Sequence, residues 1–166
     1  MIYCTNDRGQ VVAVAPDALQ ASPAVYGIMI DEYEQVLLLP HEPTELWRPP
    51  GGLLTPQQTP QNAVRHFFRQ VTGMTAQVLS LIYVEDQYRI VEEGQAYRLS
   101  MMYYALRKST FTAVSPDPNG ETAAARWLPI AELQPANLLF GWEAIRAARL
   151  HHAALDGTPS AARLAP

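Results

Sequence analysis

The chain has 166 residues, 48% of them hydrophobic and 17% charged, and its formal net charge is −4. This size and composition are typical of one folded soluble domain and exclude a largely disordered chain. Lys108 is the only lysine of this acidic chain, so we expect no nucleic-acid partner. No run approaches the roughly 18 consecutive apolar residues of a membrane span, so we expect no membrane partner.

The cysteine content and the start of the sequence indicate the compartment. Cys4 is the only cysteine, which excludes an intrachain disulfide and a cysteine-rich zinc site. Residues 1–7 lack the charged and then apolar pattern of an export signal. We therefore expect a cytoplasmic protein.

The first forty residues predict strands. Residues 2–5 and 11–15 flank a turn-forming run at residues 6–9, which predicts an N-terminal hairpin. Residues 24–30 and 36–39 are nearly continuous apolar runs, which are typical of strands covered on both faces. Such a sheet needs helices on either side, so we expect an α/β fold with a helix–sheet–helix sandwich.

The clearest helix in the sequence follows an irregular, proline-rich segment at residues 40–59. Thr59 is a good N-cap, Pro60 suits the first helical position and Gly73 suits a left-handed position after the last turn. At about 100° per residue, one face of this helix is apolar. That face consists of Pro60, Val64, Phe67, Phe68 and Val71.

The second half of the chain predicts another hairpin. Two long strand-like runs, residues 76–91 and 96–106, are joined by a glycine-containing connection at residues 92–95. Residues 115–120 indicate a loop, and residues 125–128 indicate a short strand.

The end of the chain predicts a helix and a tail. Asn137 is expected to cap a last helix that runs to about residue 155. We interpret residues 1–157 as a single domain, with a hairpin extension at residues 1–23, and residues 158–166 as a mobile C-terminal tail.

Three segments together resemble the Nudix hydrolase family: residues 47–52 (WRPPGG), the capped helix, and residues 127–133 (WLPIAEL). The resemblance covers roughly residues 24–133. It implies a Nudix-type α/β/α sandwich with a mixed β-sheet. The family's box, G-x5-E-x7-R-E-U-x-E-E-x-G-U with U a bulky aliphatic residue, starts at Gly52 and places its second glycine on Gly73.

The box keeps its frame but lacks its carboxylates. Its glutamate positions fall on Gln58, Phe67, Gln70 and Val71, and its arginine on His66. In the family these glutamates hold divalent cations against a substrate diphosphate and help to activate water. Mg²⁺ prefers anionic oxygen ligands, which amides and hydrocarbons do not supply. We therefore expect no metal, no cofactor and an absent or severely impaired hydrolase activity, with Mg²⁺ required only if the chain is an active hydrolase.

The same surroundings supply candidates for ligand binding. These are Arg48, Gly52, Gln58, Arg65, Phe67, Arg69 and Gln70. Arginine binds phosphate bidentately without a metal, so Arg48, Arg65 and Arg69 are candidates to hold a diphosphate. The alternative is that the helix arginines form a solvated face. Phe67 and Val71, four residues apart, either pack into the core or line a pocket wall.

Three hypotheses follow from the resemblance and the missing carboxylates. The first is a catalytically impaired Nudix-fold protein that binds a nucleotide-like small molecule or a partner. The second is an active hydrolase of a nucleoside diphosphate linked to another moiety, with Glu121 or Glu85 as the catalytic acid outside the box. The third is a structural module whose apolar face around Phe67 and Val71 forms a homodimer or partner interface.

Overall fold

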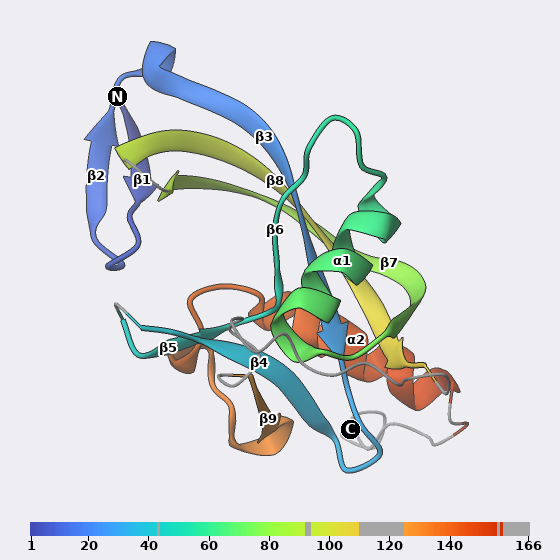
Figure 1. The fold of residues 1–166 in the computed structure, drawn as a ribbon. Helices are drawn as coiled ribbons and strands as arrows, with labels where there is room; N and C mark the ends of the chain where they lie inside the picture. Colours follow the sequence, from blue (N-terminus) through green and yellow to red (C-terminus); the bar gives the residue numbers. More distant parts are fainter. Residues whose placement is uncertain (43, 92–93, 110–124, 156, 158–166) are drawn as a thin grey trace.

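The computed structural model describes all residues except 43, 92–93, 110–124, 156 and 158–166 (Figure 1). Within the described residues, six strands form a curved central sheet: β1 (Ile2–Thr5), β2 (Val11–Val14), β3 (Leu19–Met29), β6 (Gly51–Leu53), β7 (Ala76–Val91) and β8 (Gln95–Lys108). Their order across the sheet is β2-β1-β7-β8-β3-β6. Because β8 runs antiparallel to β7 and parallel to β3, the sheet is mixed, as predicted.

A smaller sheet of three described strands lies beside the large one. It consists of β5 (Leu46–Arg48), β4 (Gln35–His41) and β9 (Arg126–Pro129), with β4 in the middle. Successive side chains of β4 enter two different cores: Val36 and Leu38 belong to one buried cluster and Leu37 to the other. The nearly continuous apolar run of this strand is therefore explained by burial on both faces.

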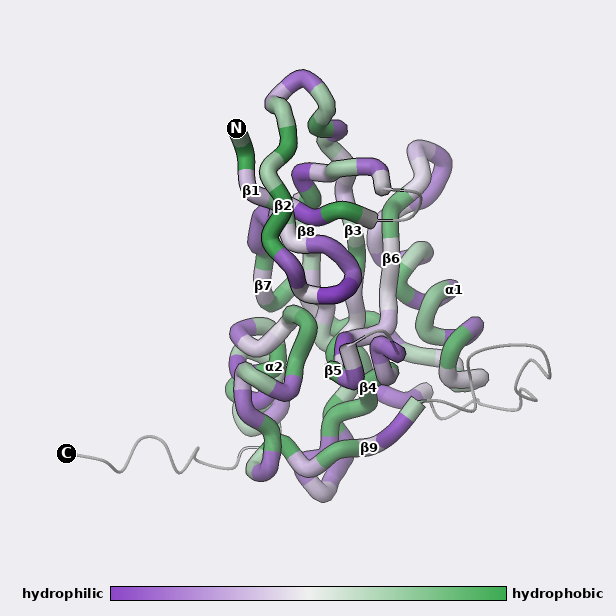
Figure 2. The backbone as a smooth tube through the Cα atoms, turned by 90° about the vertical axis from the view of Figure 1, so that its left-hand side faces the viewer, coloured by the Kyte–Doolittle hydropathy of each residue, from purple (hydrophilic) through white to green (hydrophobic). Residues whose placement is uncertain are grey.

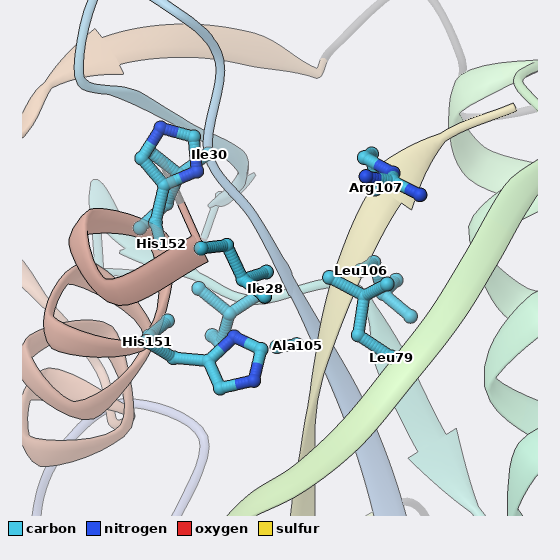
Figure 3. A pocket seen from close by; sticks show the side chains of 10 residues that line it. Ile28, Ile30, Leu79, Ala105, Leu106, Arg107, His151 and His152 are labelled. Atoms are coloured by element: carbon cyan, nitrogen blue, oxygen red, sulfur yellow. The ribbon is translucent and has the colours of Figure 1, made fainter. Parts of the chain in front are cut away.

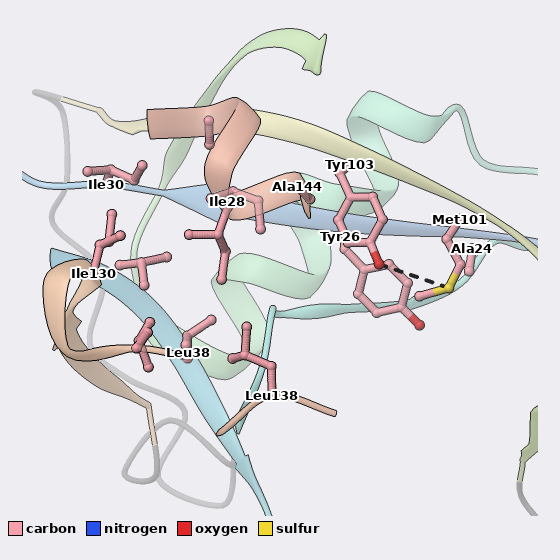
Figure 4. Packing of buried hydrophobic residues seen from close by; sticks show 14 of the residues in the cluster. Ala24, Tyr26, Ile28, Ile30, Leu38, Met101, Tyr103, Ile130, Leu138 and Ala144 are labelled. Carbon is pink, nitrogen blue, oxygen red and sulfur yellow. Dashed lines mark hydrogen bonds between the residues drawn. The ribbon is translucent and has the colours of Figure 1, made fainter. Parts of the chain in front are cut away.

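Two helices cover opposite faces of the large sheet, α1 (Pro60–Thr72) and α2 (Trp142–Leu155). Neighbouring residues of β3 alternate between these faces. Tyr26 and Ile28 pack in one cluster with Ala144 of α2 (Figure 4), whereas Val25 packs in the other with Val64 of α1. The predicted α/β/α sandwich is confirmed.

The predicted limits of α1 are confirmed by its caps. The Thr59 hydroxyl accepts a 3.4 Å hydrogen bond from the Asn62 N–H, and Pro60 occupies the first turn. Gly73 ends the helix with φ of 68°, and its N–H donates to the Arg69 carbonyl oxygen over 2.9 Å. The sequence signals at both ends therefore act locally, as capping requires.

Both predicted hairpins are present, β1 with β2 and β7 with β8. A short 3₁₀ turn, η1 (Pro16–Ala18), leads from the first hairpin into β3. Residues 92–93 of the second connection lie outside the described residues.

The prediction that residues 40–59 are irregular is wrong, because this segment contains β5, β6 and the end of β4. β5 and β6 are only three residues long each, too short to show a periodic apolar pattern. Their pairing partners, β4 and β3, stabilise them by tertiary hydrogen bonding.

The predicted start of the last helix at Asn137 is also wrong. Asn137 lies in a 3₁₀ turn, η5 (Pro135–Asn137), where its side chain accepts a 2.8 Å hydrogen bond from the Gln134 N–H. α2 begins five residues later at Trp142, after Gly141 with φ of 95°. A second 3₁₀ turn, η4 (Ile130–Glu132), precedes η5. The capping signal of Asn137 therefore serves the short turn.

Three further expectations are limited by what the structure describes. The loop predicted at residues 115–120 and the tail predicted at residues 158–166 lie outside the described residues. The division into a domain at residues 1–157 and an extension at residues 1–23 stays a prediction. Among the described helices, none combines the length and hydropathy needed to cross a membrane.

Candidate functional site

The two glycines at the start of the box lie on the edge strand β6. Gly51 and Gly52 pair with Tyr26 and Val25 of β3. A Cβ at Gly51 would collide with the Val25 carbonyl oxygen, so this close approach requires glycine. A Cβ at Gly52 would lie 3.1 Å from Cζ of Phe67. The Phe67 ring therefore covers the backbone of β6 at Gly52.

Phe67 and Val71, at two glutamate positions of the box, are both partly buried. Phe67 packs against the cluster under α1 that includes Val64 and Phe68. Neither Phe67 nor Val71 is among the exposed large hydrophobic side chains of the described residues. These contacts favour core packing over a pocket wall for Phe67.

The other two glutamate positions carry amides in different surroundings. The Gln58 Oε1 atom is buried and has no hydrogen-bond partner among the described residues, whereas Gln70 is exposed on α1. Mg²⁺ takes octahedral coordination by hard oxygen ligands, and a protein usually holds it through one or two carboxylates. This donor set does not fit Mg²⁺. In the described part of the chain, no group of three or more His, Cys, Asp or Glu side chains could hold a metal ion.

The two helix arginines lie on the far side of α1. Arg65 and Arg69 are exposed and form no ion pair with another described residue. At 100° per residue, each points roughly 160° away from Phe67 around the helix axis. The structure therefore does not bring Arg65 and Arg69 together with Gly52 and Phe67.

A cluster of polar and aromatic side chains, the Arg89 cluster, lies on the α2 face of the sheet, and the charge of Arg48 acts on it. Its members are Tyr26, Glu85, Arg89, Tyr103 and Phe140. Burial raises the pKa of the Tyr26 phenol, the positive charges of Arg48 and Arg89 lower it, and the negative charge of Glu85 raises it. The Tyr26 ring packs edge-on against Phe140, with 4.8 Å between ring centroids. Tyr26 therefore lies within electrostatic range of two cations and one carboxylate.

Arg89 is the buried charged side chain of this cluster, only 7% exposed. Burial lowers the pKa of its guanidinium group, since the charged form loses hydration. Its Cζ atom lies 5.2 Å from the centroid of the Phe140 ring, a cation–π contact, and its Nη1 donates a 3.3 Å hydrogen bond to Gln87 Oε1. No described carboxylate forms a salt bridge with it. Arg89 is thus a buried cation that forms no salt bridge with a described carboxylate, although the negative charge of Glu85 is near enough to raise the pKa of its guanidinium group.

Tyr103 connects this cluster to a carboxylate. Its hydroxyl donates a 2.6 Å hydrogen bond to Glu85 Oε1. Its ring lies beside that of Tyr26 (Figure 4), with 5.6 Å between the two ring centroids. Burial, reinforced by the bond to Glu85, raises the pKa of the Tyr103 phenol. Tyr103 therefore stays a neutral donor that holds the Glu85 carboxylate in place.

The two candidate acids outside the box are placed differently. Glu85 lies on the sheet face opposite α1, because its partner Tyr103 belongs to the cluster under α2. Its neighbour Asp86 points to the other face and accepts a 2.8 Å hydrogen bond from the Ser100 hydroxyl. Glu121 lies outside the described residues. The structure therefore places Glu85 on the face of the sheet opposite α1, the helix that carries most of the box.

Arg89, Tyr26 and Tyr103 are candidate site residues that sequence reasoning missed. One signal was available: Glu85, Gln87 and Arg89 recur at every second position of a long strand and so share one face. The two tyrosines come from other strands, β3 and β8, and only the tertiary pairing brings them to that face.

A separate cavity of about 70 Å³ lies at the C-terminal end of α2 (Figure 3). His151 and His152 line it together with apolar side chains of the sheet, and His151 Nε2 lies 2.9 Å from the Ser80 hydroxyl oxygen. Phe140 precedes the other end of α2, so this cavity is not part of the Arg89 cluster.

Several solved structures share this fold. The ADP-ribose pyrophosphatase of Streptococcus suis has 17% identity and a TM-score of 0.57, over 81% of this chain and 91% of that chain. A UDP-X diphosphatase has 18% identity and a TM-score of 0.59, over 88% of this chain and 66% of that chain. A NUDIX hydrolase from Nitrosomonas europaea has 17% identity and a TM-score of 0.59, over 81% and 90%. At these identities the similarity shows the fold.

The family assignment comes from the sequence. A comparison with curated proteins finds no match. A comparison with protein families matches residues 21–148 to the NUDIX domain. This match covers well over half of the chain, and the protein belongs to the NUDIX family.

Proposed function

We propose that this NUDIX-family protein binds an anionic, nucleotide-like small molecule, and that metal-assisted diphosphate hydrolysis is absent or severely impaired in it. One observation carries the loss of hydrolysis: the box positions for carboxylates hold two amides and two hydrocarbons, and one of these, Phe67, packs on Gly52. A divalent cation at this place would find no anionic ligand from the box, so the protein would not hold it there to act as a Lewis acid or to activate a water.

The buried cation Arg89 supports the binding of an anion. Burying a charge is costly, and Glu85, whose charge acts on Arg89, forms no salt bridge with it, so an anionic ligand would offset that cost through charge-assisted hydrogen bonds. The Tyr26 hydroxyl forms no hydrogen bond with another described residue, so it can donate to the same ligand. The charge of Arg48 adds to the positive potential at this hydroxyl.

The ligand class we propose is a nucleoside diphosphate linked to a further moiety. The diphosphate matches the guanidinium groups in charge and in bidentate geometry. The rings of Tyr26 and Phe140 offer an aromatic surface beside Arg89 for an apolar part of the same molecule. The names of two structural relatives, an ADP-ribose pyrophosphatase and a UDP-X diphosphatase, are consistent with this class.

Calorimetric titration of the full chain with ADP-ribose and UDP-glucose in the presence of a chelator tests the proposal. We expect binding without divalent cations. Arg89→Met should weaken it by about tenfold or more, because a hydrogen bond to a charged group contributes about 1.5–3 kcal/mol. Arg65→Met removes an exposed arginine from the far side of α1 and is the matched control, with unchanged affinity expected.

Two outcomes would contradict the proposal. Equal affinities of the wild type and Arg89→Met, with both proteins folded by circular dichroism, would remove Arg89 from the site. Metal-dependent turnover of either compound would favour the active hydrolase instead. In that case Glu121→Gln and Glu85→Gln identify which acid replaces the box, since only the catalytic one abolishes turnover.

A further inference from the structure

The cavity between the end of α2 and the sheet is apolar inside. Its volume is about 70 Å³, and β3, β7, β8 and α2 all contribute to its walls (Figure 3). Hydrophobic and hydrophilic residues alternate along α2 (Figure 2), as in a helix that packs one face on a core. The apolar lining is buried except at Leu79 and consists of Ile28, Ile30, Leu79, Ala105, Leu106 and Ala148.

Two small residues leave this space open. Ala105 on β8 and Ala148 on α2 both line the cavity, and neither side chain is long enough to fill it. The pairing of β7 with β8 also shifts register just before Ser80, and such a bulge changes the direction of nearby side chains. His151 Nε2 lies 2.9 Å from the Ser80 hydroxyl oxygen. A polar contact, in place of apolar packing, therefore joins the helix to the strand here.

The mouth of the cavity is basic. Arg107 of β8 and His151 and His152 of α2 line it. Arg107 is exposed and donates a 3.0 Å hydrogen bond from Nη2 to Gln77 Oε1, but it forms no ion pair with another described residue. Among the described residues, no Asp or Glu lines the cavity. The charge at the mouth therefore favours an anion.

Arg107 is the cation best placed to hold that anion. The C-terminal end of a helix carries a partial negative charge, which disfavours an anion beside the two histidines. The hydrogen bond of Arg149 and, to a smaller extent, the charge of His152 lower the pKa of Glu34, so His152 already faces an acidic group. Arg107 lies on the sheet, and its guanidinium group keeps N–H donors that the bond to Gln77 does not use.

We propose that this cavity binds a short aliphatic carboxylate, of about three to five carbons, with its chain inside and its carboxylate on Arg107. An apolar protein cavity of about 150 Å³ holds a benzene ring, so a cavity of about half that volume fits a short chain. Water fits the volume too, but the apolar lining gives it few hydrogen-bond partners. The site lies at the opposite end of α2 from the Arg89 cluster and does not rest on the proposed function.

Methyl NMR spectroscopy of the full chain during titration with n-butyrate tests this site. We expect the methyl resonances of Ile28, Ala105 and Ala148 to shift and the shifts to saturate. Acetate should bind about tenfold more weakly, because it lacks two methylene groups that the cavity would bury. n-Butanol has the chain without the charge and should also bind more weakly than n-butyrate.

Two variants separate the charge from the cavity. Arg107→Gln should weaken n-butyrate binding about threefold to fivefold, as expected for a partly exposed ion pair, and should leave n-butanol binding unchanged. Lys108→Gln is its matched control and should bind n-butyrate as the wild type does, because neighbouring side chains on a strand point to opposite faces. Ala148→Leu places a longer side chain in the cavity and should abolish binding of both compounds.

Several results would overturn the proposal. These are a wild type without saturable shifts at the three methyl-bearing residues, equal affinities for n-butyrate and n-butanol, and a loss in Arg107→Gln no greater than that in Lys108→Gln. Undiminished binding by a folded Ala148→Leu would overturn it as well. If Ala148→Leu does not fold, the two glutamine variants still decide, since both change exposed side chains.

Discussion

Replacing Phe67 by alanine tests whether hydrocarbon at the box supports the fold. The ring of Phe67 lies over Gly52 and packs against the cluster under α1. If this contact is core packing, its loss destabilises the protein. If the ring instead lines an open pocket, the truncation leaves stability unchanged and alters only ligand binding.

The magnitude follows from burial. Truncating a fully buried phenylalanine to alanine costs about 3–5 kcal/mol of unfolding free energy. Phe67 is only partly buried, so we expect about 2 kcal/mol. The adjacent Phe68, 0% exposed on the same helix, provides the matched control with the full cost. Both variants gain the same helix propensity from alanine, so that term cancels in the comparison.

Urea unfolding followed by circular dichroism measures both variants. The account predicts the order wild type, Phe67→Ala, Phe68→Ala from most to least stable, with clear gaps between them. A loss below about 0.5 kcal/mol for Phe67→Ala, within the usual range of surface substitutions, would refute the packing role of this ring.

Two further predictions concern backbone geometry and pH. Gly51→Ala should lower the unfolding free energy by about 2 kcal/mol or more, because the new Cβ would collide with the Val25 carbonyl oxygen. Gly9→Ala, with open space around it, should lower the unfolding free energy less in the same urea assay. The hydrogen bonds of Arg149 lower the pKa of Glu34. This pair therefore stabilises the fold at pH values above the usual glutamate pKa, and the stabilisation is lost as the pH falls through the lowered pKa. Glu34→Gln should therefore be less stable than the wild type at neutral pH, by under about 1 kcal/mol because both groups are half exposed, and equally stable in strong acid.

The sequence predicts best where the structure is determined by local interactions. Thr59, Pro60 and Gly73 define α1 because capping and left-handed backbone geometry act within one turn of the chain. The two hairpins follow for the same reason. Asn137 is the instructive exception: it is the last residue of a 3₁₀ turn, where its side chain accepts a hydrogen bond from the N–H of Gln134 before that turn, and α2 starts only after Gly141.

The candidate site was only half predictable. The register of the box identifies Gly52 and Phe67, which do touch, because both belong to one local motif. It does not reveal that Arg65 points away, or that Arg89 lies buried beside Tyr26 on the opposite face of the sheet. Those relations depend on strand order and on which face each strand position presents, which no local pattern encodes.

Release of AMP from ADP-ribose by the purified full chain, with Mg²⁺ or Mn²⁺ and with or without a chelator, is the most direct test of the missing metal chemistry. The account predicts no release above the buffer control with either cation. Rapid release that the chelator abolishes would contradict it, because two amides, a phenylalanine and a valine would then have to support a working cation site.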